Sequence, residues 1–304
     1  MEGQTTQINQ APQIQGNLAL NPSATVTSIN QTAPLAASTI NLPVLAMPEE
    51  VILAAKENTV AGERFPFEKI KMPSGGGLTF ELTDENGKTT PVTEIKGIVL
   101  AFKPFRSWYE KSFAERSDED DPMPDCYSSD CVTGSGCQSA GIPAGQKCDT
   151  CSKGQWGSSR NGGRGKDCGD RMGIWILLEG YAVPHFIGLP KTSLGNFKDY
   201  RKRLTSKAKV YYGVVTAIGL EKSKNETGKI EFSKATFAKA ADLSAEERGL
   251  IKKYIDAISG SLQVSRDAIT VDDSAHEDVG GGSSGPDLNQ MDFSKSNTNQ
   301  EQAY

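Results

Sequence analysis

All six cysteines of the chain lie within one 44-residue stretch, 125–168, that lacks the periodicity of a helix or a strand. Cys148 and Cys151 form a C-x2-C pair, and Cys168 follows 17 residues later. Tetrahedral zinc takes four thiolate or imidazole ligands, and a C-x2-C turn offers two sulfurs to one ion. Cys126 completes the set because Cys126 and Cys168 bracket the stretch. The spacing predicts a structural zinc site formed by Cys126, Cys148, Cys151 and Cys168.

Two alternatives concern the same cysteines. Cys131 and Cys137 are less regularly spaced and could be plain thiols, alternative ligands or half of a second arrangement. Six cysteines could also form a disulfide scaffold, but this requires an oxidising compartment, and the first residues do not have the pattern of an export signal. We therefore favour zinc, and we expect a cytoplasmic protein of a bacterial host.

Catalytic chemistry has little support in the sequence. The chain contains two histidines, and no nucleophile, base and orienting group can be assembled around either of them. Gly87, Lys88 and Thr89 have part of a phosphate-loop pattern, but Leu82 stands where the first glycine is required. Four thiolate ligands also leave no open position on a zinc ion. We expect the protein not to be an enzyme.

Charge is distributed unevenly along the chain, although the net charge is only -5. Residues 153–224 contain fourteen bases and five acids, with aromatic residues among them. Single-stranded nucleic acid binds where Lys and Arg meet phosphates and flat rings stack on bases. The predicted nucleic-acid-binding residues are Trp156, Arg160, Arg164, Lys166, Arg171, Trp175, Lys191, Arg201, Lys202, Arg203, Lys209, Tyr211 and Lys222.

The aromatic residues of this region have two interpretations. Half or more of them should belong to the hydrophobic core, and a basic helix face is commonly just solvated. Tyr212 alternates with Val214 and Ile218 and is expected in the core. Trp156, Trp175 and Tyr211 are expected at the surface, where they could stack on bases.

Both ends of the chain have the composition of disordered segments. Residues 1–47 contain no Lys or Arg and show no sustained period, so we expect a disordered arm. Residues 266–304 contain eight acids and two bases and include a Gly/Ser run, which predicts a flexible acidic tail. Such a tail could compete with nucleic acid for a basic surface and, once displaced, bind replication proteins. The folded domain is expected over 48–265.

Within this domain the patterns alternate between strands and helices. A helix is predicted from Pro48, and strands are predicted at 68–72, 78–82, 95–102, 172–178, 183–189, 210–218 and 230–237. Leu194, Phe197, Tyr200 and Leu204 recur at helical spacing, and a last helix starts at Ser244. From residue 95 on, this is the element order of an OB-fold, a five-stranded Greek-key barrel in a mainly β (α+β) protein. The cysteine stretch would then lie between strands one and two, where such barrels bind oligonucleotides.

Several short motifs also carry a family resemblance. They are Cys126, Cys148–Cys151, Trp156–Ser158, Gly165–Cys168, Leu177–Gly180, Leu189–Ser193, Tyr212–Val215 and Gly219–Lys222. The chain from about 67 to 262 resembles an uncharacterised family carried by bacteriophages and mobile elements. By organisation it also resembles the T4-type phage single-stranded-DNA-binding proteins, which have an OB-fold, a zinc loop and an acidic C-terminal tail. It departs from them in offering only cysteines where they include a histidine ligand.

Together these patterns predict a sequence-tolerant single-stranded-DNA-binding protein of phage replication or recombination. A second hypothesis is a zinc-stabilised adaptor that binds a polymerase or another replication or transcription protein. A metal-dependent nuclease has the least support. No run of about 18 apolar residues is present, so no membrane partner is expected.

Overall fold

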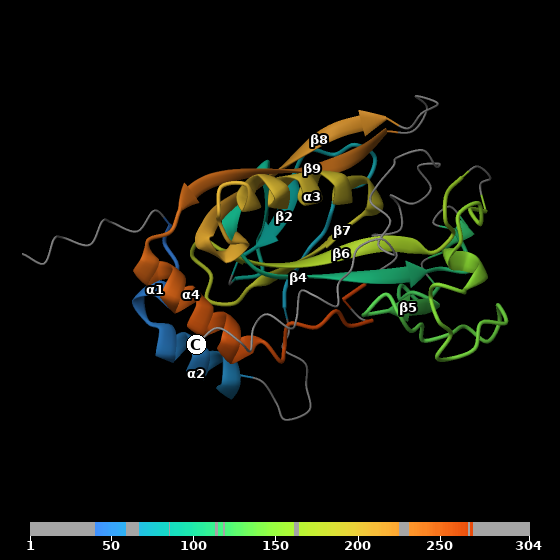
Figure 1. Ribbon diagram of the computed structural model, residues 1–304, viewed down its shortest axis with the longest axis horizontal. Coiled ribbons are helices and arrows are strands. Elements are labelled where there is room, and N and C mark those ends of the chain that lie inside the picture. The colour runs from blue at the N-terminus through green and yellow to red at the C-terminus, as the bar shows by residue number, and fades with distance from the viewer. Residues whose placement is uncertain are drawn as a thin grey trace, which may run out of the picture. The chain divides into compact units, whose positions relative to one another are not determined.

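The computed structural model describes residues 40–58, 67–84, 86–112, 115–117, 119–160, 164–224, 231–266 and 268–269. Its helices are α1 (Pro43–Ala46), α2 (Pro48–Glu57), α3 (Lys191–Thr205) and α4 (Ala245–Ile258), with short 3-10 turns η2 (Ser152–Gly154) and η3 (Tyr211–Gly213). Its strands are β1 (Lys69–Ile70), β2 (Phe80–Thr83), β3 (Thr89–Val92), β4 (Glu94–Trp108), β5 (Cys126–Ser128), β6 (Gly169–Leu178), β7 (His185–Leu189), β8 (Val214–Lys224) and β9 (Glu231–Asp242). The protein is mainly β with few helices (Figure 1).

One curled sheet of seven strands dominates the fold. Its main order is β1-β7-β6-β4-β8-β9, and β5 pairs with the end of β4. The β2 and β3 strands form a separate hairpin. All pairs of the large sheet are antiparallel except β1 with β7, which is parallel. Five barrel strands were predicted, and the short strands β1 and β5 extend the sheet to seven.

The long strand β4 is central because three strands pair with it. Along one edge it pairs with β6 from Gly97 to Ser107. Along the other edge it pairs with β8 at its start, from Glu94 to Gly97, and with β5 at its end, from Arg106 to Trp108. Within the described residues, no strand pairs with that second edge between Ile98 and Phe105, so the strand pairing has an opening there.

Hydrophobic residues fill both faces of the sheet. One core contains Ile174 and Ile176 of β6 with Leu194 and Phe197 of α3. The second core contains Trp175 of β6 packed with residues of α1, α2 and α4, such as Tyr254. Every residue of β6 is buried. The alternation in β6 therefore separates two cores and not a core from solvent.

The packed region is longer than the predicted domain at both ends. Ile40, Leu42 and Val44, which fall in the predicted arm 1–47, are buried in the second core. Val264 and Ile269 are buried there as well, so packing continues past the predicted boundary at 265. The apolar residues of these short flanking segments complete the core over α4. The remainder of the arm and most of the acidic tail lie outside the described residues.

Most of the predicted elements are present with shifted ends. The helix from Ser244 is α4, whose capping box joins the Ser244 side chain to Glu247 N and the Glu247 side chain to Ser244 N. The strand predicted at 210–218 begins at Val214, because Tyr211–Gly213 form the turn η3. Within the described residues, no helix has the length and apolar character needed to cross a membrane.

Candidate nucleic-acid interface and cysteine cluster

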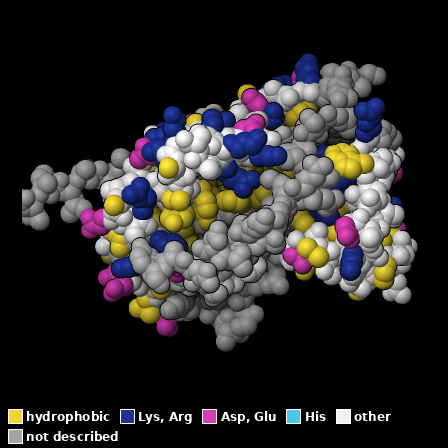
Figure 2. Space-filling model, in the orientation of Figure 1, with side chains coloured by type: hydrophobic (Ala, Val, Ile, Leu, Met, Phe, Trp, Pro, Cys, Tyr) yellow, Lys and Arg dark blue, Asp and Glu magenta, His cyan; other side chains and the backbone are white. Residues whose placement is uncertain are grey.

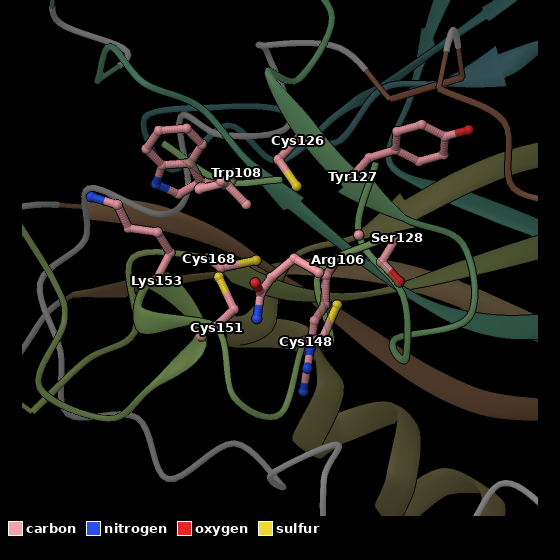
Figure 3. A pocket seen from close by; sticks show the side chains of 13 residues that line it. Arg106, Trp108, Cys126, Tyr127, Ser128, Cys148, Cys151, Lys153 and Cys168 are labelled. Carbon is pink, nitrogen blue, oxygen red and sulfur yellow. The ribbon is translucent and has the colours of Figure 1, made fainter. Parts of the chain in front are cut away.

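The four predicted zinc ligands line a single hollow at the end of β4. Cys126 starts β5, Cys148 and Cys151 lie on the turn before η2, and Cys168 immediately precedes β6. Figure 3 shows the four sulfur-bearing side chains around this hollow. The volume of the hollow is about 20 Å³. By the same measure one water molecule needs roughly 10–15 Å³, so the hollow has room for one small occupant.

Backbone contacts bring the cysteine-bearing segments together. Cys168 N donates to Lys153 O (2.8 Å), and Cys148 N donates to Val132 O (2.9 Å). Gly154 allows a close approach, because a Cβ at this position would lie 2.8 Å from Cys148 O. Few regular hydrogen-bonded elements order this stretch, so these contacts largely define its path.

The side chains as placed are not a ready ligand set. In the described parts of the chain, no three or more His, Cys, Asp or Glu side chains are grouped closely enough to hold a metal ion. All six cysteines are free thiols. Burial raises the pKa of the Cys126 thiol, although hydrogen bonds from Gly136 and Ser135 oppose this shift. The hollow therefore brings four thiols together without placing them at ligand distances from one point.

Cys131 and Cys137 do not line the hollow. Cys131 is half-exposed as a residue, its backbone is left-handed with φ of 63°, and burial of its thiol raises the pKa. Cys137 Sγ lies 3.0 Å from Ser139 Oγ, which donates to Glu110. The four cysteines selected by their spacing are thus the four that line the hollow, and Cys131 and Cys137 lie outside it.

A buried charged group lies beside the hollow. Arg106, which lines it, donates from Nε to Asp170 Oδ1 at 2.8 Å, and Lys166 Nζ lies 3.1 Å from Asp170 Oδ2. These three side chains are at most 5% exposed. Burial opposes the charge on Arg106, but the pKa of Arg106 is raised, chiefly by the charge and hydrogen bond of Asp170. No sequence pattern indicated this ion group, because its members come from different strands and a loop.

Trp156 is the most exposed ring among the predicted stacking residues. It is 49% exposed, and the ammonium nitrogens of Lys166 and Lys191 lie 4.9 Å and 5.0 Å from its ring centroid. Lys166 comes from the cysteine stretch and Lys191 begins α3. Trp156 is thus exposed, as expected, but Lys166, also a predicted nucleic-acid contact, has a buried side chain paired with Asp170.

Two predicted contact residues are in the interior. Trp175 is fully buried between Phe67 and Phe186, so the expectation that it lies at the surface is wrong. Arg171 is also fully buried and donates to Ser107 Oγ at 2.8 Å. Trp175 belongs to the core that contains residues of α1, α2 and α4. Neither side chain can reach a ligand in the folded protein.

Several other predicted cations are paired within the protein. Arg160 donates to Asp167 at 2.7 Å and to the carbonyl oxygens of Tyr109 and Glu110. Although burial opposes it, the bonds from Arg160 and Trp108 lower the pKa of Asp167. The remaining contacts are Lys202 with Asp199, Arg203 with Phe237 O, Lys209 with Asp242, and Lys222 with Glu231. Arg164 is exposed.

Tyr211 and Arg201 form a second aromatic and basic group. Tyr211 is half-buried, and its ring centroid lies 5.0 Å from that of Phe102 on β4. The guanidinium carbon of Arg201 lies 4.6 Å from the centroid of the same Phe102 ring. The sequence predicts Phe102 only as part of a strand, because the opening beside it forms from segments that are distant in the chain.

Comparisons of the chain with protein-family models, curated proteins and solved structures found no match. The resemblance to phage proteins therefore remains an expectation, and the functional argument rests on the geometry of this chain.

Proposed function

We propose that the protein binds single-stranded nucleic acid without reading its sequence and without catalysis. The observation that carries this proposal is the exposed Trp156 indole with two lysine ammonium groups within 5.0 Å of its centroid. A base can stack on the accessible ring while Lys191 meets a neighbouring phosphate, and Lys166 stays paired with Asp170. Each stacked base contributes about 1–3 kcal/mol regardless of its identity.

The basic surface over α3 supports the same function. Lys and Arg side chains gather over this helix, next to a hydrophobic band (Figure 2). Lys191, Lys198 and Arg201 lie on the side of α3 that turns away from β9. On the opposite side, Asn196 and Arg203 donate to carbonyl oxygens of β9. The basic side therefore does not take part in the packing of α3 on β9.

The strand order supports an OB-fold interpretation. Counting β4, β6, β7, β8 and β9 as strands one to five, the sheet runs three-two-one-four-five, with α3 between strands three and four. This is the antiparallel order of an OB barrel. The third strand, β7, pairs on its outer edge with β1, so the barrel is left open in the described residues. Trp156 and the cysteines lie between strands one and two, a region that OB-folds use for oligonucleotides.

We also propose a structural zinc ion bound by Cys126, Cys148, Cys151 and Cys168. It is supported by their convergence on one hollow, because tetrahedral zinc takes four such ligands. Four thiolates around zinc leave excess negative charge, which Arg106 and Lys153, both lining the hollow, would balance. The role in phage replication and the binding of replication proteins by the acidic tail remain predictions.

The test is a titration of the full chain with labelled oligo(dT) at two salt concentrations. Binding is measured by the anisotropy of the label and by tryptophan fluorescence. We expect quenching from Trp156, because Trp108 and Trp175 are 2% and 0% exposed. Binding should weaken with salt, with a log-log slope of about -0.7 for each phosphate contacted.

A matched pair of variants sharpens this test. Trp156→Ala should weaken binding by about 1–3 kcal/mol and abolish the quenching. Val132→Ala removes another exposed apolar side chain of the same stretch, 62% exposed, and should change neither. Equal affinity for duplex DNA, a flat salt response or unchanged binding by Trp156→Ala would contradict the proposal.

A further inference from the structure

Arg201 is a half-buried cation with no acidic partner. Its Nε atom is buried and donates no hydrogen bond, and no ion pair joins its guanidinium to a carboxylate in the described parts of the chain. Burial lowers its pKa. A cation that loses water contacts without gaining a counterion is costly unless an anion joins it.

Aromatic rings surround this guanidinium. Its carbon lies 4.6 Å from the ring centroid of Phe102 and 5.1 Å from that of Phe197. Tyr211 packs edge-on against Phe102 and is in turn 5.3 Å from the Tyr212 centroid. Phe102, Tyr211 and Tyr212 are each half-buried, so part of their surface is open to solvent.

The sheet is open at this position. Phe102 lies on the part of β4, between Ile98 and Phe105, whose second edge pairs with neither β8 nor β5. The turn η3, which carries Tyr211, lies beside this opening because its residues contact β4. The exposed parts of the Phe102, Tyr211 and Tyr212 rings are the surface that a ligand would contact here.

Arg201 lies on the same side of α3 as the lysine next to Trp156. Lys191, Lys198 and Arg201 are separated by seven and three residues, a spacing that keeps them on one side of a helix. Ten residues of helix separate the first from the last by about 15 Å. In the described residues Lys198, between them, forms no ion pair or hydrogen bond. The three cations thus connect the Trp156 ring to the Phe102 and Tyr211 rings.

We propose that Arg201, with Phe102 and Tyr211, forms a second subsite for one phosphate and one base, so that a strand stacked on Trp156 runs along α3 to this site. This inference rests on the proposed function and extends it by naming the path. The phosphate neutralises Arg201, and a base packs on the open part of the rings.

The experiment compares the full chain with its Arg201→Gln and Arg201→Lys variants. Oligo(dT) of about 4 and about 16 nucleotides span the usual range for one OB-fold. With the longer oligonucleotide, Arg201→Gln should weaken binding roughly tenfold, as expected for one hydrogen bond to a charged group. The magnitude of the log-log salt slope should decrease by about 0.7 in Arg201→Gln and stay unchanged in Arg201→Lys. Trp156 should still be quenched in both variants.

Controls separate this site from general charge and from folding. Lys253→Ala removes an exposed lysine of α4, over the other face of the sheet, and should leave the slope unchanged. Lys198→Ala, which removes no packing contact of Arg201, should lower the slope as well. If Arg201→Gln lowers the thermal midpoint strongly, its binding is not comparable with that of the wild type, and the salt slope of Lys198→Ala is the deciding measurement.

The outcomes distinguish the two proposals. If the wild-type chain binds and quenches Trp156 but Arg201→Gln and Lys198→Ala keep its slope, the second subsite is wrong and the proposed function stands. The second subsite is also wrong if Lys253→Ala lowers the salt slope as much as Arg201→Gln does. If the wild-type chain binds neither oligonucleotide, both proposals fail.

Discussion

Arg106 Nε donates a 2.8 Å hydrogen bond to Asp170 Oδ1, with the two side chains 2% and 5% exposed. Arg106 belongs to β4 and Asp170 to β6, so the pair joins the two central strands beneath the cysteine hollow. Lys166 also contacts Asp170 and lies over Trp156. One buried carboxylate therefore holds the cation beside the hollow and the cation beside the candidate stacking ring.

Removal of this carboxylate should be strongly destabilising. Breaking a buried ion pair leaves an uncompensated charge and costs about 3–5 kcal/mol. Asp170→Asn leaves both Arg106 and Lys166 without it, so it should cost more than Arg106→Met. Urea denaturation measures both free energies of unfolding. Asp256→Asn, which removes an exposed partner of Lys252, is the control and should change stability by about 0.5 kcal/mol or less. Equal, small effects for all three variants would contradict the buried arrangement.

The two tryptophans of opposite exposure should respond oppositely to truncation. Trp175→Ala empties a space in the core and should cost about 3–5 kcal/mol, whereas Trp156→Ala should stay within about 0.5 kcal/mol. Thermal or urea unfolding gives the first comparison, and acrylamide quenching of the wild-type protein should report one accessible indole. A Trp175→Ala variant of unchanged stability would show that this residue is not in the core.

Zinc should bind in a ratio of one ion to one chain. Cys148→Ser combined with Cys151→Ser should abolish the metal content measured by mass spectrometry, and a chelator should lower the thermal midpoint of the wild-type protein. Cys137→Ser, outside the hollow, is the matched control and should retain the ion. Cobalt substitution should give the absorption of a tetrahedral thiolate site. Wild-type protein without metal, or loss of metal from the control alone, would contradict the site.

Stability should fall below neutral pH because of His185. Its side chain is 4% exposed, and burial lowers its pKa although Glu68, 3.2 Å from Nε2, raises it. Tyr181, the other group packed on the imidazole, meets it edge-on. Below about pH 6.5 the unfolded chain binds a proton that the folded chain does not, so the unfolding free energy decreases as the pH falls toward the lower folded pKa.

The check is urea denaturation between about pH 5 and pH 7.5, where few other side chains titrate. His185→Gln should flatten the dependence in this window. The only other histidine, His276, lies outside the described residues, and His276→Gln is the control. If the unfolding free energy of His185→Gln depends on pH as that of the wild type does, a group other than His185 causes the dependence.

Local patterns in the sequence determined much of this protein. The spacing of Leu194, Phe197, Tyr200 and Leu204 predicts the buried side of α3, because helical periodicity is a property of neighbouring residues. The capping pattern at Ser244 likewise predicts the start of α4. Cysteine spacing alone separated the four residues that line the hollow from the other two.

Burial and pairing across the chain were decided by the tertiary structure. Alternation in β6 shows that Trp175 lies opposite Ile174, but which layers cover each face depends on α4 and on Val44, far away in sequence. The Arg106–Asp170 pair and the Arg201–Phe102 contact likewise join residues 64 and 99 positions apart. Such contacts depend on how distant segments pack together, and no local pattern in a single sequence carries that information.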